Sequence, residues 1–180
     1  MSGVQARLWT VGHSTHTLAE FVGLLHDQRI ARLCDVRTVP KSRRHPHFWA
    51  EALSVSLPEQ AVAYRHLAGL GGWRHSRADS PNGAWRNDSF RGYADYALTD
   101  AFVAALDELC GIAREQRTAI MCSEGLWWRC HRRLIADRLT AGGWEVSHIG
   151  TDGRISPHRL PDFAEPQPDG TVRYPASAGT

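Results

Sequence analysis

Short apolar runs alternate along this chain with amphipathic segments, and this alternation constrains the fold more than any other feature. Five runs have the length and residue types of buried strands. The segments between them repeat their apolar residues at helical spacing, as Leu18, Phe21, Val22 and Leu25 do. Strands that alternate with helices form a largely parallel sheet with helices on both faces. We therefore predict one α/β domain of about five strands, at residues 8–12, 31–36, 62–67, 117–121 and 144–149.

Capping residues mark where the predicted helices begin. Thr17 and Glu20 form a capping-box pattern before the first helix, and Thr99 precedes a helix that runs to about Glu115. Two more helices are predicted over residues 48–57 and 133–142.

Two segments lack periodicity. Residues 69–91 are rich in glycine, tryptophan and arginine, and an irregular segment of this length inside a compact domain is usually functional. Residues 161–180 are rich in proline and glycine, and we expect a loose tail there after a single domain at 1–160.

Composition narrows the compartment and the class of protein. No apolar run approaches the roughly 20 residues that span a bilayer, and the first residues lack the apolar centre of a secretory signal. We therefore expect a cytoplasmic protein with no membrane partner. Its four cysteines have no C-x-x-C spacing, so they are predicted to be free thiols and not zinc ligands. The sequence indicates no metal and no cofactor, and it leaves the oligomeric state open.

Residues 122–133 (CSEGLWWRCHRR) join the fourth predicted strand to the following helix. In open α/β sheets, ligands bind at such strand-to-helix turns. Cys130 and His131 are expected in the first helical turn, where the positive end of the dipole favours a thiolate. Glu124 is the best candidate for a general acid or base. Cys122 is interpreted as a reactive thiol, although a cysteine at a buried strand end is often inert.

The ends of the first and second strands carry further polar groups. His13, Ser14 and Thr15 follow the first strand, where backbone N–H groups can hold an anion or a hydroxyl can cap the next helix. Asp35 ends the second strand and must be paired if it is buried. An internal ion pair with Arg37 and a catalytic role are equally compatible with this position.

Residues 37–46 (RTVPKSRRHP) form a basic segment after the second strand, and Pro40 and Pro46 stiffen it. Its cations suit phosphate groups, and the rings beside them suit a nucleic-acid strand or a nucleotide base. The segment at 90–96 is expected to add an arginine and a tyrosine over the same pocket. The predicted catalytic residues are Glu124, Cys122 and Asp35, and the predicted substrate- or phosphate-binding residues are His13, Ser14, Thr15, Arg37, Lys41, Arg43, Arg44, Arg91, Tyr93, Arg129, Cys130, His131 and Arg132.

Taken together, four motifs resemble a bacterial family catalogued as domain of unknown function 488. They are residues 10–15 (TVGHST), 35–44 (DVRTVPKSRR), 90–93 (FRGY) and 121–132 with its MCSE and CHR ends. The resemblance covers roughly residues 8–150. It implies a compact α/β domain, supports the site assignment and leaves the reaction open.

A second, weaker resemblance is to the rhodanese-type sulfurtransferases. It rests on residues 33–37 (LCDVR), followed later by a strand, Cys122, a loop and a helix. This resemblance implies that Cys122 carries sulfur and that Arg129 is the loop arginine. The interval from Cys122 to Arg129 is longer than in that family, and Trp127 and Trp128 occupy the loop.

These observations predict an enzyme that acts on a nucleic acid or nucleotide, at the base or the glycosidic bond. Glu124 would act there with Asp35 or Cys122, and a carboxylate suits an oxocarbenium-like transition state. Rhodanese-like or other thiol chemistry at Cys122 is the second hypothesis. A non-catalytic module that binds nucleic acid or phosphate is the third. A metal-dependent enzyme is a further possibility, since His13, Cys122, Cys130 and His131 are suitable ligand types without diagnostic spacing.

Overall fold

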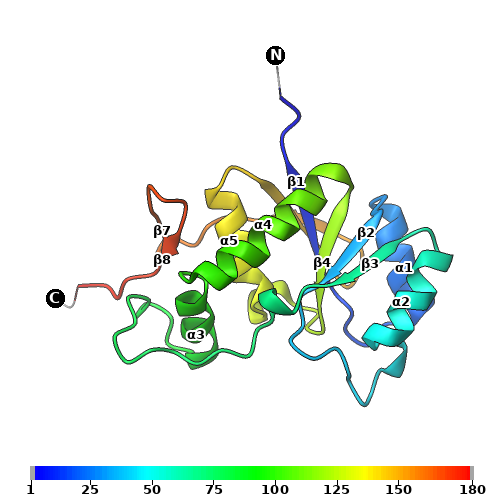
Figure 1. Ribbon diagram of the computed structural model, residues 1–180, viewed down its shortest axis with the longest axis horizontal. Coiled ribbons are helices and arrows are strands. Elements are labelled where there is room, and N and C mark those ends of the chain that lie inside the picture. Colours follow the sequence, from blue (N-terminus) through cyan, green and yellow to red (C-terminus); the bar gives the residue numbers. More distant parts are fainter. Residues whose placement is uncertain (1–2, 179–180) are drawn as a thin grey trace.

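A six-stranded sheet forms the centre of the computed structural model, which describes residues 3–178 (Figure 1). The strands are β1 (Arg7–Gly12), β2 (Arg32–Asp35), β3 (Ala63–His66), β4 (Thr118–Cys122), β5 (Glu145–Ile149) and β6 (Ile155–Pro157), in the order β3-β2-β4-β1-β5-β6. The first five are parallel, and β6 pairs antiparallel with β5. The predicted α/β class is confirmed. The sequence missed β6, because three exposed residues carry no alternating apolar signal.

The register of the parallel strands brings three strand ends together. Gly12 of β1 pairs with Cys122 of β4, and Asp35 of β2 pairs with Met121. The chain therefore leaves β1, β2 and β4 at nearly the same level, at the carboxyl edge of the sheet. This is the edge at which the sequence predicted a binding site.

Helices cover both faces of the sheet. They are α1 (Leu18–Asp27), α2 (Ala50–Glu59), α3 (Asp88–Tyr96), α4 (Asp100–Glu115) and α5 (Arg132–Ala141), with 3-10 turns η1 (Pro46–Phe48), η2 (Ala68–Leu70) and η3 (Trp127–Arg129). The helices α1 and α2 pack on one face through Phe21, Leu25, Leu53 and Leu57. On the other face α3, α4 and α5 enclose a second apolar cluster (Figure 1).

The predicted helix starts agree with the capping geometry. The Thr17 side chain accepts the Glu20 amide while the Glu20 carboxylate accepts the Thr17 amide, so the capping box is complete. Thr99 caps α4 by accepting the amide of Phe102. Both helices therefore begin where local hydrogen bonding alone requires them to begin.

The segment at 69–91 is ordered by one buried carboxylate. Asp95 of α3 accepts hydrogen bonds from the Arg77 amide, the Ser80 hydroxyl and the Asn82 side chain. The last part of the segment is helical, because α3 begins at Asp88. The absence of periodicity up to Arg91 therefore concealed the first turn of a helix.

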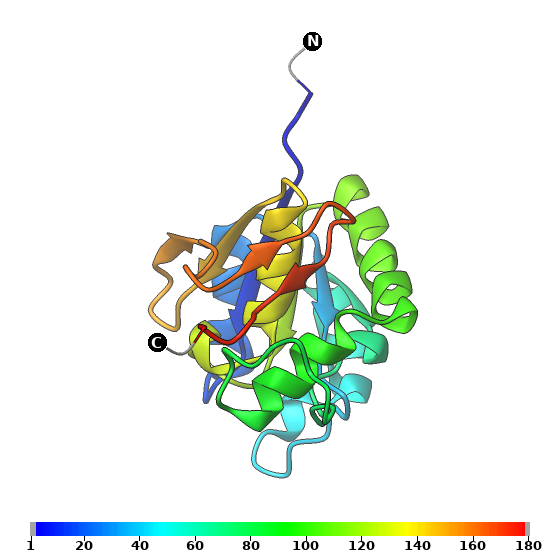
Figure 2. The same cartoon turned by 90° about the vertical axis from the view of Figure 1, so that its left-hand side faces the viewer.

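The C-terminal segment is packed against the domain, and the expectation of a loose tail is wrong for residues 165–174. β7 (Glu165–Pro166) and β8 (Val172–Arg173) form a hairpin, which Figure 2 shows in orange and red across α5. Val172 and Tyr174 are buried in the cluster around α5. Two apolar side chains in a polar, proline-rich stretch give no periodic signal, so the sequence did not indicate this docking.

A chain of buried polar side chains links the sheet to this C-terminal segment. His148 of β5 lies 2.6 Å from the Thr10 hydroxyl and 2.8 Å from the His158 ring. The other nitrogen of His158 lies 2.6 Å from the Asp137 carboxylate, which also accepts the Tyr174 hydroxyl at 2.6 Å. His148 is buried at the centre of this chain, where it joins the sheet to the C-terminal segment.

Within the described residues, no helix combines the length and the apolar character needed to cross a membrane.

Candidate functional site

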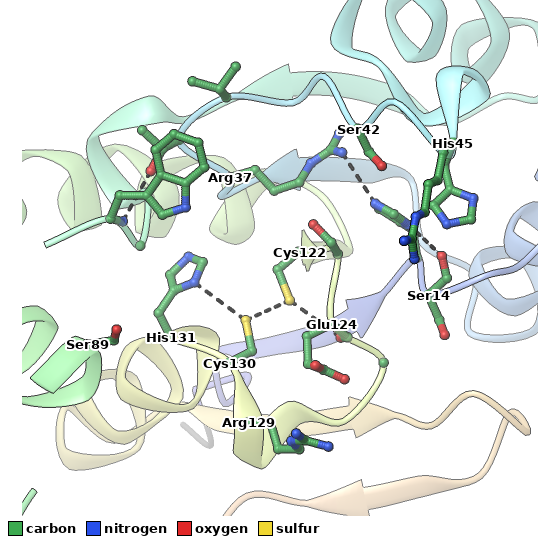
Figure 3. A pocket seen from close by; sticks show the side chains of 18 of the residues that line it. Ser14, Arg37, Ser42, His45, Ser89, Cys122, Glu124, Arg129, Cys130 and His131 are labelled. Atoms are coloured by element: carbon green, nitrogen blue, oxygen red, sulfur yellow. Dashed lines mark hydrogen bonds between the residues drawn. The ribbon is translucent and has the colours of Figure 1, made fainter. Parts of the chain in front are cut away.

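A pocket of about 690 Å³ opens at the carboxyl ends of β1, β2 and β4 (Figure 3). Four segments form its wall: the turn after β1, the basic segment after β2, the loop that leads into α3, and the loop after β4. The lining residues are His13, Ser14, Thr15, Arg37, Thr38, Val39, Ser42, Arg44, His45, Gly72, Trp73, Asn87, Ser89, Phe90, Cys122, Ser123, Glu124, Gly125, Arg129, Cys130 and His131. Three of these segments are the strand ends at which the sequence predicted a site.

The turn after β1 is joined to the loop after β4 by backbone hydrogen bonds. The amides of His13 and Ser14 donate to the carbonyls of Cys122 and Ser123. Gly12 permits this close approach, because a Cβ there would lie 1.9 Å from the Glu124 carbonyl oxygen. The position of the Glu124 backbone therefore depends on a glycine in the neighbouring strand.

The ring of His13 is buried and neutral, and it forms part of the pocket wall. Its ring stacks on Phe48 at 4.4 Å, and its Nδ1 lies 2.8 Å from the Ser14 carbonyl, so Nδ1 carries the proton. The unprotonated Nε2 then faces Arg37 at 3.4 Å. Burial lowers the pKa of His13 to about 4, the Ser14 hydrogen bond opposes this, and the Arg37 charge adds to it.

This lowered pKa predicts that acid destabilises the fold. Below its ordinary pKa of 6.5 the unfolded His13 binds a proton while the folded ring does not. The contribution of His13 to the free energy of unfolding is therefore complete above pH 6.5 and is lost as the pH falls from 6.5 to 4. A His13→Asn variant is expected to flatten the dependence of unfolding free energy on pH by about 1.4 kcal/mol per pH unit in this range. Chemical denaturation at pH 7, 6, 5 and 4.5 measures the slope. The exposed His75→Asn is the control, and an unchanged slope in His13→Asn would contradict the assignment.

Asp35 is buried behind the pocket and does not line it. Its carboxylate accepts the amide, Nε and Nη2 of Arg37 and, at 2.6 Å, the hydroxyl of Tyr64. Arg37 Nη2 also donates to the Phe48 carbonyl at 2.6 Å. Of the two roles that the sequence left open for Asp35, this geometry is that of an internal ion pair, which holds Arg37 against the pocket wall.

The basic segment contributes fewer cations to the pocket than predicted. Arg37 and Arg44 line it, whereas Lys41 lies 3.6 Å from Glu51 on the surface and Arg43 is exposed outside the lining. Pro46 begins η1 and ends this segment. The sequence did not select Ser42 and His45 as site residues, although both line the pocket.

Arg91 and Tyr93 do not stand over the pocket, and that prediction is wrong. Tyr93 is fully buried and its hydroxyl donates to the Leu70 carbonyl, while Arg91 donates to the Trp85 carbonyl. Both residues lie within α3, whose first turn faces the pocket instead. The pocket residues from this region that the sequence did not select are Gly72, Trp73, Asn87, Ser89 and Phe90, and Thr38 was not selected in the segment after β2.

The loop after β4 presents Glu124 and Arg129 to the pocket. Both side chains are exposed, and the Glu124 carboxylate accepts the Leu126 amide at 3.2 Å. Trp127 anchors the loop from behind by stacking on His148, with ring centres 4.1 Å apart. The indole therefore fixes the loop and leaves the carboxylate open to a ligand.

Arg132 supports this loop and is not a phosphate-binding residue of the pocket. It is buried, and its Nη2 donates to the carbonyls of Glu124 and Gly125. Within residues 3–178, its Nε and Nη1 have no hydrogen-bond partner. The guanidinium thus keeps an unneutralised positive charge beneath the floor of the pocket.

Cys122 and Cys130 meet on that floor, with their Sγ atoms 2.7 Å apart (Figure 3). Cys130 lies before the helix and not in its first turn as predicted, since His131 is the N-cap of α5. The Cys130 sulfur accepts the Arg132 amide at 3.5 Å and lies 3.5 Å from His131 Nδ1. His131 Nε2 lies 2.7 Å from the Val36 carbonyl, so Nε2 carries the ring proton and Nδ1 is an acceptor.

The two thiols ionise differently. Burial raises the pKa of Cys122 well above its ordinary value, and its hydrogen bond with Cys130 raises it further. Burial also opposes ionisation of Cys130, but the hydrogen bond with Cys122 and the Arg132 charge and amide outweigh it, so the pKa of Cys130 is lowered. Burial lowers the pKa of His131 as well, which keeps its ring neutral. Cys130 therefore ionises more readily than Cys122.

The four residues named as possible metal ligands, His13, Cys122, Cys130 and His131, are not arranged as a metal site. Over residues 3–178 no group of three or more His, Cys, Asp or Glu side chains is arranged to hold a metal ion.

Comparison with known proteins identifies one family. A family model described as "Domain of unknown function DUF488" matches residues 17–139, which include the basic segment, α3 and the loop from Cys122 to Cys130. No curated protein matches the chain, and no solved structure matches it.

Proposed function

The chain belongs to the family described as domain of unknown function DUF488, and because that description names no reaction, we propose a function from the pocket itself. The protein is an enzyme that acts on a nucleotide or nucleic acid, at the base or its glycosidic bond, with Glu124 as its acid–base group. The observation that carries this proposal is that Glu124 is the one carboxylate among the residues lining a pocket otherwise walled by cations, hydroxyls and rings.

The class of ligand follows from the wall of the pocket. Arg44 and Arg129 line it, and neither forms an ion pair within the part of the chain that the structure describes. Arginine side chains without a carboxylate partner suit phosphate oxygens. The Trp73 ring on the rim is 75% exposed and offers a face on which a base can stack.

The proposed role of Glu124 follows from the exposure of its side chain in the pocket. Asp35 is occupied by Arg37 and Tyr64, so a paired-carboxylate mechanism with Asp35 has no support in this geometry. A single open carboxylate can orient and deprotonate a water molecule that attacks the sugar carbon. The same negative charge stabilises the oxocarbenium-like transition state that breakage of a glycosidic bond produces.

A Glu124→Gln variant is expected to bind ligand normally and to lose turnover by about 10²–10⁴-fold, the usual contribution of an acid–base group. Release of free base from nucleoside monophosphates and from single-stranded oligonucleotides measures turnover, and titration calorimetry with the same compounds measures binding. Glu115→Gln, at the exposed end of α4, is the matched control. Arg44→Ala is expected to weaken binding and to reduce its salt dependence.

Each other outcome has a definite reading. Full turnover in Glu124→Gln would remove the carboxylate from the mechanism. Salt-dependent binding by the native protein, with no base released from any substrate, would make the pocket a binding module. Absence of binding to every nucleotide and oligonucleotide would overturn the proposed class of ligand.

A further inference from the structure

We propose that Cys130 and Cys122 form a redox-active dithiol on the pocket floor that reduces small disulfides carrying carboxylates, with Cys130 as the attacking thiol and Cys122 as the resolving thiol. This activity does not depend on the proposed chemistry of Glu124. It differs from sulfur transfer by Cys122, because the reacting thiol is the other cysteine and two thiols are consumed.

The first support is the distance between the sulfur atoms. They lie 2.7 Å apart, and a disulfide bond measures about 2.05 Å, so a small side-chain movement closes the bond. The two cysteines are brought together by different elements, since Cys122 ends β4 and Cys130 precedes α5. The other two cysteines, Cys34 and Cys110, lie in the apolar cluster on the α4 side of the sheet.

The second support is the asymmetry of the surroundings. The Cys130 sulfur accepts a backbone N–H at the start of a ten-residue helix, where the dipole favours negative charge. The neutral His131 Nδ1 lies 3.5 Å away and can take the thiol proton. The Cys122 thiol instead donates a hydrogen bond to the Glu124 carbonyl oxygen at 3.5 Å, which favours the protonated thiol over a thiolate.

The third support is the buried guanidinium of Arg132. Its unpartnered Nε and Nη1 leave a positive charge beside both sulfur atoms, which helps to lower the pKa of Cys130 and only partly opposes the raised pKa of Cys122. A buried charge without a counter-ion is costly, and a thiolate at Cys130 would compensate it. The same charge would stabilise the thiolate form of the reduced pair.

The class of substrate follows from the pocket above the thiols. Both cysteines line the pocket, and Cys130 is the more accessible residue, at 7% exposed against 2% for Cys122. Arg44 and Arg129 flank the entrance and suit carboxylates as well as phosphates. A small disulfide with carboxylates on each half therefore complements both the floor and the walls.

The reaction proceeds in two exchanges. The Cys130 thiolate attacks one sulfur of R–S–S–R, forms a Cys130–S–R bond and releases R–S⁻ with the electron pair of the broken bond. Cys122 then gives its proton to the departing R–S⁻ and attacks Cys130 Sγ, which forms the Cys122–Cys130 bond and releases the second R–S⁻. Two protein thiols are oxidised to one disulfide, and R–S–S–R is reduced to two thiols, the last proton being the one that His131 took from Cys130.

The test uses oxidised glutathione with the full reduced chain and peptide mass spectrometry. We expect the native protein to give a peptide cross-link between Cys122 and Cys130 and to release two glutathione molecules per chain. Cys122→Ser should accumulate a glutathione adduct on Cys130, since the second step is removed. Cys130→Ser should react at Cys122 at least tenfold more slowly, and Cys110→Ser should behave as the native protein.

The outcomes separate this proposal from the preceding one. Glu124→Gln should retain the exchange even where it has lost turnover of a nucleotide. Rapid adduct formation on Cys122 in Cys130→Ser, or an adduct on native Cys130 that never resolves, would overturn the proposal. If either serine variant fails to fold, alkylation of the native protein at pH 7 decides instead, because Cys130 must react at least tenfold faster than Cys122.

Discussion

An Asp35→Ala variant is expected to lose about 3–5 kcal/mol of unfolding free energy, the usual cost of removing one partner from a buried ion pair. The carboxylate is fully buried and is the common acceptor for three N–H groups of Arg37 and for the Tyr64 hydroxyl. Alanine leaves the guanidinium buried without its counter-charge and leaves the tyrosine without its acceptor. The wall of the pocket would loosen, because Arg37 also holds the Phe48 carbonyl and faces His13.

Urea denaturation of Asp35→Ala and of a matched surface variant measures this effect. Glu51→Ala is suitable, since it removes one partner of the exposed ion pair with Lys41 at 3.6 Å. An exposed pair of this kind contributes less than about 1 kcal/mol. Equal, small losses in the two variants would contradict the structural role assigned to Asp35 and would reopen a role in catalysis.

Asp137→Ala is expected to be the second severe change, with a loss of about 2–6 kcal/mol from two buried groups left without an acceptor. One oxygen of the carboxylate lies 2.6 Å from the His158 ring and the other accepts the Tyr174 hydroxyl. Without it, the chain of buried polar groups from Thr10 ends at a His158 nitrogen that has lost its partner. The β7–β8 hairpin would also lose its hydrogen bond to α5.

Two measurements separate the global effect from the local one. Denaturation gives the total loss, and limited proteolysis reports release of residues 161–178. Tyr174→Phe removes only one hydrogen bond and should cost about 1 kcal/mol, while the exposed Asp162→Ala should leave both measurements unchanged. Protection of the C-terminal segment in Asp137→Ala equal to that of the native protein would show that the hairpin does not depend on this carboxylate.

Much of the site could be predicted because strand ends and loops follow local patterns. The apolar runs located β1, β2 and β4, and parallel pairing placed the groups that follow them at one edge. His13, Glu124 and Cys122 line the pocket for that reason. Arg91 and Tyr93 could not be placed, because the direction of a side chain in α3 depends on how the helix packs and not on its sequence alone.

The burial of Arg132 and the full set of partners of Asp35 were further features that local patterns did not reveal. Both side chains carry charges that normally lie at the surface, and both are almost fully buried, although the strand pattern already indicated a buried position for Asp35. Their environments are made by residues from other elements: the Glu124 carbonyl for Arg132 and the Tyr64 hydroxyl for Asp35. Asp35 and Tyr64 are 29 residues apart, so no short window of sequence contains both.

The sequence by itself determined the α/β class, the starts of α1 and α4, and the edge of the sheet that carries the polar groups. Hydrophobic periodicity and capping act over a few residues, so they can be read along the chain. Only the tertiary structure decided that Cys130 meets Cys122, that Asp35 is occupied by Arg37 and Tyr64, and that the C-terminal hairpin docks on α5. These features rest on the packing of separate elements, which local periodicity does not specify.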